Sequence, residues 1–411
     1  MLDELPRSKA FLQRWIAPRL REAVAQHRVV LLTGPKQVGK STLLVMTSPF
    51  SDWRYLTLDD FDTLLLAKET PQALWAGVEH VVIDEIQKAP ELVKRAVEGK
   101  ITFLLAGSVP LGSFTQDAPD LPDQVAHYHL RPLALGEVDR SAAPAILTEL
   151  LHGAWPQVGK HSKIDRDPLE HLLHGLLPPL VFEYRPSAYR NWWQAYVSEY
   201  LERDLQQLSH ITNLPDFRRL MAATALRTGR TLNQSASARE ANLSQPTAHR
   251  YLSLLGRSKL LERLPSSSPR AVETLVRSPT LFWHDPALPV FLAGYFDRPA
   301  LESSREIEYF FKNLVFHHLR VLTDLLQPPT RIYHWQTRKN QAVDFVVEHA
   351  GVSLAVQVSF GAEPSPNAVR NLAAFLDQYP DAVGGILIYS GETVRDLGAK
   401  LLALPWELIT G

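Results

Sequence analysis

The stretch LLTGPKQVGKST, residues 31–42, contains a phosphate-binding pattern. Gly34, Gly39, Lys40 and Ser41 fit G-x-x-x-x-G-K-[ST], in which the glycines let successive backbone amides face phosphate oxygens. The apolar run HRVVLLT before the loop predicts a buried strand, and KSTLLVM after it predicts the first turns of a helix. The alternative is a plain glycine turn between the two. The residues expected to bind a nucleotide are Gly34, Pro35, Lys36, Gln37, Val38, Gly39, Lys40, Ser41 and Thr42.

A nucleotide loop needs a second, acidic site before it can support hydrolysis. The run HVVIDEIQKAP supplies one, because a strand ending in paired acids would put Asp84 near Mg²⁺ and Glu85 near the attacking water. A third strand, ITFLLAGS, ends at Ser108, whose hydroxyl could orient that water beside the γ-phosphate. The alternative for the acid pair is a strand that simply ends in solvated side chains. We therefore expect ATP and Mg²⁺ as cofactors, Glu85, Lys40 and Ser108 as catalytic residues, and Ser41 and Asp84 as metal ligands.

Strand-like runs alternate with helical stretches through the first third of the chain. Another apolar run, YLTLDD, ends in Asp59 and Asp60. This alternation predicts a doubly wound α/β domain with a parallel sheet and its site at the carboxyl ends of the strands.

Composition limits the classes of protein to consider. The chain has 411 residues, a net charge of −1 and no cysteine. That length predicts several domains, and the near-zero charge requires any nucleic-acid contact to come from a local basic patch. Disulfides and thiolate metal sites are excluded. No apolar run is long enough to span a membrane, and the N-terminus lacks a signal peptide's apolar centre. We expect a cytoplasmic protein without membrane contact.

Several of these runs together resemble a widespread bacterial and archaeal family of AAA-type ATPases. The matching runs are RVVLLTGPKQVGKSTLL, YLTLDD, VVIDEIQKAPEL, FLLAGS and LRPLALGE. In that family the ATPase is followed by a winged helix and a restriction-endonuclease-like C-terminal domain of unknown role. The acidic motif with its IQKAPEL continuation is far more particular to the family than the phosphate loop. The resemblance covers nearly the whole chain and implies an α/β multidomain ATPase.

Two positions depart from the family pattern. Family members mostly have an arginine where this chain has Lys36, and LPDQV stands where the family usually reads LAGRV. If that family arginine senses the γ-phosphate, Gln124 cannot replace its charge. Arg131, seven residues further on, is a candidate substitute.

Residues 141–212 lose strand-like alternation and predict a helical lid or connector after an ATPase core at 1–140. NWWQAYVSEYLERDLQQL has helical spacing of its apolar residues. The stretch also resembles the family's helical connector, whose YLERD is matched at 200–204. Arg203 could reach a bound nucleotide. The alternative is a salt bridge on the helix surface.

Residues 213–300 predict a winged helix-turn-helix. In LSQPTAHRYLSLLGR, Ser244 is a good N-cap and Pro246 lies in the first turn. The residues expected on its buried face are Ala248, Tyr251, Leu252 and Leu255. KLLERLPSSSPR predicts a strand, a Ser/Pro loop and a return, which together form a wing. The residues expected to contact DNA are Gln245, Thr247, His249, Arg250, Ser253, Arg257 and Arg263.

Charge in this region favours DNA over a purely structural role. Between Arg239 and Arg277 there are seven Lys or Arg residues against three Glu. Such side chains can contact phosphates. Backbone binding is favoured over sequence readout, because only one Arg projects from the predicted recognition helix. The alternative is a winged helix that docks a protein or serves only in packing.

Residues 301–411 predict an α/β domain whose element order resembles the restriction-endonuclease-like core. A long helix, three strands, a helix and a further strand follow one another. The motif there is an acid on the first helix, an Asp on the second strand and Glu-x-Lys on the third. The matching positions are Glu308, Asp344, Gln357 and Ser359. Because Gln357 lacks the negative charge and Ser359 the positive charge that cleavage requires, we expect no nuclease activity. The domain would then serve as a scaffold, as a dimerisation surface or as a nucleic-acid groove without cleavage.

Two histidines, His127 and His129, share one face of a strand-like run. Two imidazoles are the minimum for a metal site, but no acid or cysteine accompanies them, so we interpret them as structural.

Two hypotheses explain what hydrolysis is for. In the first, a homo-oligomeric machine couples ATP turnover to DNA binding or remodelling, as in ring motors that drive branch migration. In the second, the chain is a slow nucleotide-gated signalling switch whose winged helix and C-terminal domain contact proteins. Gln124 favours the second, because ring ATPases generally need an arginine finger from the neighbouring subunit.

Overall fold

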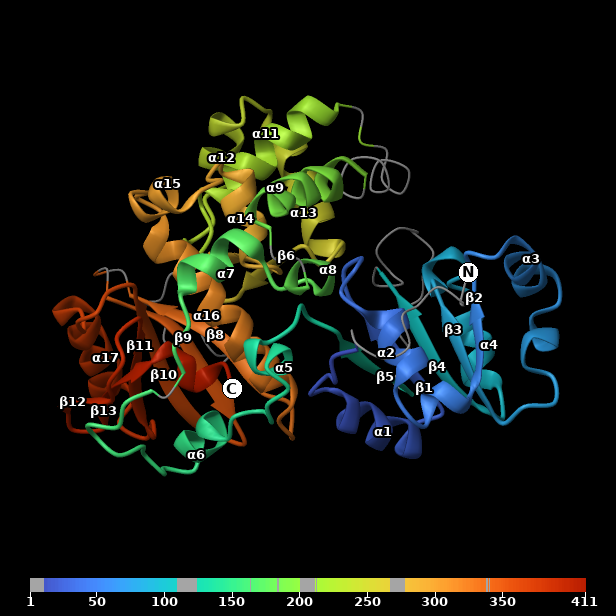
Figure 1. The fold of residues 1–411 in the computed structure, drawn as a ribbon, viewed down its shortest axis with the longest axis horizontal. Coiled ribbons are helices and arrows are strands. Elements are labelled where there is room, and N and C mark those ends of the chain that lie inside the picture. Colours follow the sequence, from blue (N-terminus) through green and yellow to red (C-terminus); the bar gives the residue numbers. More distant parts are fainter. Residues whose placement is uncertain are drawn as a thin grey trace.

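A computed structural model describes residues 11–108, 124–162, 164–182, 185–199, 211, 213–266, 278–337, 339 and 341–411. Three units are visible in Figure 1. An N-terminal α/β unit lies at one end, a C-terminal sheet unit lies at the other, and a mostly helical unit lies above the junction between them.

The N-terminal unit is built on a five-stranded parallel sheet with the order β2-β3-β4-β1-β5. Its strands are β1 (Val29–Thr33), β2 (Arg54–Thr57), β3 (His80–Asp84), β4 (Thr102–Gly107) and β5 (Val125–His129). Strand β4 lies between the strand that leads into the phosphate loop and the strand that ends in the acid pair. All five carboxyl ends meet at one edge, as the predicted doubly wound fold requires.

Helices cover both faces of this sheet. They are α1 (Ala17–Gln26), α2 (Lys40–Met46), α3 (Phe61–Glu69) and α4 (Leu92–Glu98). Val30 and Leu32 of β1 share a hydrophobic cluster with α1 and α2, whereas Val29 and Leu31 share one with α3 and α4. Burial on both faces explains why β1 is apolar throughout instead of alternating.

The predicted helical connector divides between two hydrophobic cores. Its helices are α5 (Leu135–Val138), α6 (Ile146–Leu151), α7 (Pro168–His174), α8 (Pro178–Val181) and α9 (Pro186–Ala195). Leu147 of α6 and Leu172 of α7 belong to the core of the C-terminal unit. Leu180 of α8 and Trp193 of α9 belong to the core shared by the N-terminal sheet and the helical unit. The segment thereby ties all three units together.

The helical unit contains helices over the stretch predicted as a helix-turn-helix, followed by an antiparallel pair of strands. Its elements are α11 (Leu214–Ala225), α12 (Gln234–Glu240), α13 (Gln245–Arg257), β6 (Leu261–Leu264), β7 (Thr280–Trp283), α14 (Ala287–Leu292) and α15 (Arg298–Glu302). The predicted N-cap is confirmed, because the Ser244 side chain accepts a hydrogen bond from the Thr247 amide. Ala248, Tyr251, Leu252 and Leu255 are buried as predicted. The predicted Ser/Pro loop of the wing lies largely in 267–277, outside the described residues.

The C-terminal unit is a six-stranded sheet with the order β12-β13-β11-β10-β9-β8. Its elements are α16 (Ile307–Asp324), β8 (Arg331–Gln336), β9 (Ala342–His349), β10 (Val352–Ser359), α17 (Pro366–Gln378), β11 (Gly384–Tyr389), β12 (Arg395–Gly398) and β13 (Leu401–Pro405). The predicted helices and strands are confirmed. Strands β12 and β13 were not predicted, and β13 extends the sheet by pairing parallel with β11. In the described part of the chain, no helix is both long and apolar enough to cross a membrane.

Candidate nucleotide site

The phosphate loop has the strained backbone that its glycines allow. Gly39 has φ +96° and adopts the left-handed conformation that glycine favours. A Cβ at Gly34 would lie 2.6 Å from the carbonyl oxygen of Leu130, so only glycine fits there. The loop is therefore fixed both by its own conformation and by the chain that follows β5.

Lys40 is buried at the centre of the site. Its Nζ donates to the carbonyl oxygens of Gly34 at 3.0 Å and Pro35 at 3.1 Å, and to Ser108 Oγ at 3.3 Å. Burial lowers the pKa of Lys40, while the nearby carboxylates act in the opposite direction. The carboxyl end of β4 thus brings Ser108 to the lysine, in the position that the sequence predicted relative to the phosphate loop.

Ser41 and Asp84 also come together. Ser41 Oγ donates to Asp84 Oδ2 at 2.5 Å, and the hydroxyl of Tyr55 donates to the same oxygen at 2.7 Å. Burial, followed by the charge of Asp84, raises the pKa of Tyr55 well above its usual range, so its hydroxyl remains a donor. A hydroxyl and a carboxylate are the hard oxygen ligands that Mg²⁺ prefers, so the pair fits this ion.

Glu85 follows with its backbone in the left-handed region, at φ +58°. Such a conformation is costly for a non-glycine residue and is concentrated at functional sites. Gln87 Nε2 donates to Glu85 Oε2, and the amide of Ser108 donates to Gln87 Oε1 at 3.2 Å. Burial, followed by the neighbouring Asp84, raises the pKa of Glu85. A carboxylate with a raised pKa is a stronger base, as activation of water requires.

The acids at the end of YLTLDD have structural roles. Asp59 pairs with Lys88 at 2.6 Å on the surface. Asp60 accepts a hydrogen bond from the Thr63 amide and caps α3. Neither adds a carboxylate to the Ser41–Asp84 pair in the structure.

A small, mostly apolar slot opens beside the phosphate loop. Its cavity is about 50 Å³ and lies next to Gly39 and Thr42. The side chains lining the slot away from the loop include Phe11, Leu12, Pro178 and Phe182. Sequence reasoning missed this slot, because its walls come from segments far before and far after the loop.

Arg14 connects the same segments and was also missed. Its Nε pairs with Glu137 Oε2 at 3.1 Å, and its Nη1 donates to the carbonyl oxygen of Val38 at 3.0 Å. Its Nη2 donates to the carbonyl oxygen of Arg131 at 2.5 Å. The buried Arg14 guanidinium therefore holds the phosphate loop against the run LRPLALGE. The resemblance of that run to the family was the only sequence signal for this contact.

Arg131 does not take the place of the family arginine that is missing at Gln124. Gln124 is exposed just before β5. Arg131 Nε pairs with Asp324 at 2.6 Å, and its Nη1 pairs with Glu262 at 3.1 Å. Although burial acts against the charge, these two carboxylates raise the pKa of Arg131, so its guanidinium is fully committed within the chain. The prediction that Arg131 substitutes for the missing family arginine is therefore wrong in this structure. Arg203 lies outside the described residues.

The predicted DNA-contacting residues fall into two groups. Gln245, His249 and Arg250 are exposed on α13, and Thr247 is partly exposed. The other group is Ser253, Arg257 and Arg263, which line a separate cavity at the other end of the helix. Arg257 is exposed as well, whereas Ser253 and Arg263 are partly exposed.

In the C-terminal unit, two of the four matched residues, Asp344 and Gln357, are in contact. The Asp344 amide donates to Gln357 Oε1 at 3.3 Å, and Glu308 Oε2 accepts from the Phe360 amide at 2.9 Å. The expectation that the positive charge is lost with Ser359 needs correction. Lys312, one helical turn after Glu308, places its Nζ 2.5 Å from Asp344 Oδ1. A lysine is thus present, but it neutralises the acid.

His127 and His129 do share a face, and both contact Thr33. His127 Nε2 lies 2.7 Å from Thr33 Oγ1, and His129 Nδ1 lies 3.3 Å from it. His129 Nε2 also lies 3.0 Å from Nε2 of His284. Among the described residues, no group of three or more His, Cys, Asp or Glu side chains could hold a metal ion.

Three regions of the chain match known families. Residues 26–138 match a family described as an AAA domain. Residues 165–298 match a domain of unknown function, DUF8612, and residues 309–409 match another, DUF4143. Two uncharacterized mycobacterial proteins, from Mycobacterium tuberculosis and Mycobacterium bovis, are each 26% identical over 406 residues, covering 97% of this chain and 84% of the relative.

Solved structures show only a loose likeness. The RuvB Holliday junction branch migration motor of Thermotoga maritima is 15% identical, covering 64% of this chain and 91% of that chain, with a TM-score of 0.28. The Aeropyrum pernix ORC1 protein in complex with DNA is 13% identical, covering 70% and 94%, with a TM-score of 0.27. Scores this low carry no conclusion about function.

Proposed function

We propose that the chain, whose residues 26–138 match an AAA domain, is a P-loop ATPase that binds ATP with Mg²⁺, hydrolyses it and couples that turnover to DNA. The observation that carries the ATPase proposal is the convergence of five side chains at the carboxyl ends of β1, β3 and β4. They are Lys40, Ser41, Asp84, Glu85 and Ser108. Each has the chemistry that phosphoryl transfer to water requires.

The chain's own residues divide the work. Lys40 exchanges its contacts with loop carbonyls for phosphate oxygens. Ser41 and Asp84 are the residues that would hold Mg²⁺, which when bound neutralises phosphate charge. Glu85 takes the proton of the attacking water, and Ser108 orients that water.

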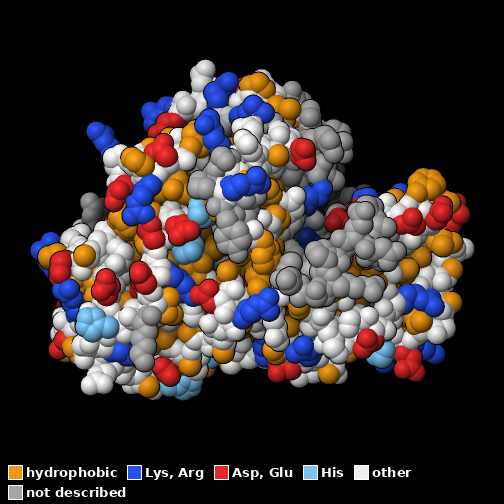
Figure 2. Space-filling model, in the orientation of Figure 1, with side chains coloured by type: hydrophobic (Ala, Val, Ile, Leu, Met, Phe, Trp, Pro, Cys, Tyr) orange, Lys and Arg blue, Asp and Glu red, His pale blue; other side chains and the backbone are white. Residues whose placement is uncertain are grey.

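Coupling to DNA is supported by the helix-turn-helix. His249 and Arg250 are exposed on α13, with Gln245 and Thr247 at its first turn. Lys and Arg side chains are spread over the lobe that contains α9 and α11–α13 in Figure 2. These residues suit contact with backbone phosphates. We further propose a cytoplasmic homo-oligomer without membrane contact.

A second candidate is a slow, nucleotide-gated switch. It is favoured by Gln124, which stands where family members usually have an arginine, and by the full engagement of Arg131 with Asp324 and Glu262. Without an arginine finger, hydrolysis is expected to be slow. In this case the winged helix and C-terminal unit would contact proteins.

The two candidates differ in their response to DNA. ATP hydrolysis is measured on the purified chain with and without duplex and four-way-junction DNA. Stimulation of several-fold that disappears at high salt, and in both Lys40→Ala and Glu85→Gln, supports the DNA-coupled ATPase. A slow rate that no DNA changes rejects it and supports the switch. No turnover at all rejects the ATPase itself.

A further inference from the structure

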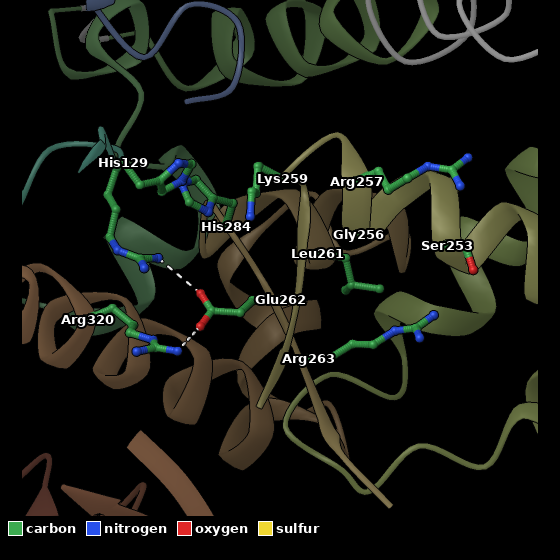
Figure 3. A pocket seen from close by; sticks show the side chains of 11 residues that line it. His129, Ser253, Gly256, Arg257, Lys259, Leu261, Glu262, Arg263, His284 and Arg320 are labelled. Atoms are coloured by element: carbon green, nitrogen blue, oxygen red, sulfur yellow. Dashed lines mark hydrogen bonds and ion pairs between the residues drawn. The ribbon is translucent and has the colours of Figure 1, made fainter. Parts of the chain in front are cut away.

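A cavity of about 670 Å³ lies where the end of β5, the end of α13, strand β6 and helix α16 meet (Figure 3). None of its lining residues belongs to the phosphate loop or to the acid pair, so it is separate from the nucleotide site. Its volume lies in the range of pockets that hold nucleotide-sized ligands.

The cavity has an excess of positive charge. Among the described residues, five cationic side chains line it against one carboxylate, that of Glu262. This carboxylate already forms ion pairs with Arg320 and with Arg131, whose Nη1 lies 3.1 Å from Glu262 Oε2. In the described part of the chain, three lining cations form no ion pair. They are Arg257, Lys259 and Arg263.

Arg263 shows most clearly that an acceptor is missing. Its Nε and Nη2 are buried, and they have no hydrogen-bond partner among the described residues. Burial lowers the pKa of Arg263 and also that of Lys259. A buried charged donor without an acceptor destabilises the fold. Phosphate oxygens would relieve this cost, since a guanidinium binds them in a bidentate manner. Figure 3 shows Arg257 and Arg263 extending toward the same side of the cavity.

One wall of the cavity connects to the phosphate loop. His284 Nε2 lies 3.0 Å from Nε2 of His129, whose Nδ1 lies 3.3 Å from Thr33 Oγ1. Thr33 immediately precedes Gly34, the first glycine of the loop. His129 lines the cavity and also contacts Thr33, so one wall of the cavity lies one hydrogen bond from the residue just before the phosphate loop.

We propose that this cavity is a second phosphate-binding site, in which Arg257, Lys259 and Arg263 hold the phosphate groups of a nucleotide-sized ligand. The phosphates come either from a free nucleotide or polyphosphate, or from a DNA strand that continues past α13. A free nucleotide or polyphosphate as the source does not rest on the proposed function, because the cavity's charge and shape require neither ATP hydrolysis nor DNA contact. A DNA strand as the source rests on the DNA coupling proposed above.

The test is binding of inorganic tripolyphosphate, measured by calorimetry on the full chain with Lys40→Ala to weaken the first site. We expect saturable binding that weakens at least tenfold when Arg263→Gln is added. Lys259→Met is a second variant, in case Arg263→Gln does not fold. Arg250→Gln is the matched control, because Arg250 is exposed on α13 outside the cavity. Absence of binding, an affinity unchanged by both cavity variants, or an equal loss with Arg250→Gln overturns the proposal.

Competition separates the sources of the phosphate groups. ADP that displaces tripolyphosphate from the Lys40→Ala protein identifies a free nucleotide as the ligand type. A single-stranded oligonucleotide that displaces it identifies a nucleic-acid backbone, and failure of both leaves polyphosphate itself. If Arg250→Gln abolishes DNA binding while tripolyphosphate binding persists, the DNA contact and the cavity are separate sites. The DNA-coupling proposal and the cavity proposal can then fail independently of each other.

Discussion

Lys312 Nζ lies 2.5 Å from Asp344 Oδ1, so the acid on strand β9 is neutralised within its own domain. The other carboxylate oxygen of Asp344 accepts from the Val358 amide at 2.9 Å. Both oxygens are thus engaged, and both side chains are about one-tenth exposed. A metal ion would have to displace the ammonium group before it could bind.

This ion pair is predicted to stabilise the fold and to leave no Mg²⁺-dependent cleavage. Lys312→Met should lower the free energy of unfolding by about 3 kcal/mol, because it leaves a buried carboxylate unpaired. Urea unfolding measures this, with Asp344→Asn and the double variant completing a cycle. The double variant should lose less than the sum of the two single variants. Additive losses, or cleavage of DNA by the unmodified chain in Mg²⁺, would contradict this interpretation.

The sequence predicted those features that depend on local pattern. The phosphate loop, the acid pair and the N-cap at Ser244 are read from residues close together in the chain, and the structure contains all three. Ser359 carries no positive charge, and the motif match gave no sign that Lys312 of α16 supplies one beside Asp344. Helical spacing alone does not tell which face of α16 approaches β9.

Residues that act over long sequence separations could not be predicted in the same way. Arg14 and the apolar slot gain their roles only when the N-terminal segment lies against the phosphate loop. Tyr55 begins the run YLTLDD. The acids of that run suggested a function in the sequence, but the Tyr55 hydroxyl is the group that reaches Asp84. Pairing of β2 with β3 places Tyr55 near Asp84, and register is a property of the sheet rather than of any one segment.

Gln87 is predicted to position Glu85 for catalysis. It donates to the carboxylate and accepts from the Ser108 amide, so Gln87→Ala frees Glu85 without touching the phosphate loop. Loss of a general base costs ~10²–10⁴-fold, and loss of its orientation should lower kcat about tenfold with little change in ATP affinity. Lys88→Met is the control, since Lys88 pairs only with exposed Asp59. Equal kcat for Gln87→Ala and the unmodified chain would rule out this role.

Arg14 is predicted to hold the phosphate loop in its binding conformation. Arg14→Lys retains the charge but cannot reach Glu137, Val38 and Arg131 at once. We expect a loss of about 3 kcal/mol in the free energy of unfolding, because the Glu137 carboxylate remains buried. ATP affinity, measured with a fluorescent analogue, should fall about tenfold. Arg21→Lys is the matched control, because Arg21 is exposed and donates only to Ser48. Unchanged ATP affinity in Arg14→Lys would exclude this role.

Buried histidines are predicted to make the fold sensitive to acid. Burial lowers the pKa of His284 and of His317 to about 3, from the ordinary 6.5. Between these pH values the unfolded chain binds more protons than the folded chain, so stability falls as the pH drops below 6.5. Each such histidine contributes a slope of ~1.4 kcal/mol per pH unit.

The free energy of unfolding, followed from pH 8 to pH 5 by urea titration, tests this dependence. His317→Gln should flatten the slope below pH 6.5 by about one proton, because the glutamine side chain cannot titrate yet can still donate to the Leu133 carbonyl that His317 contacts at 3.1 Å. His152, which is exposed near the end of α6, supplies the control His152→Gln, whose slope should match that of the unmodified chain. A slope that His317→Gln leaves unchanged, or a fold that gains stability toward pH 5, would show that proton binding to these histidines does not govern acid unfolding.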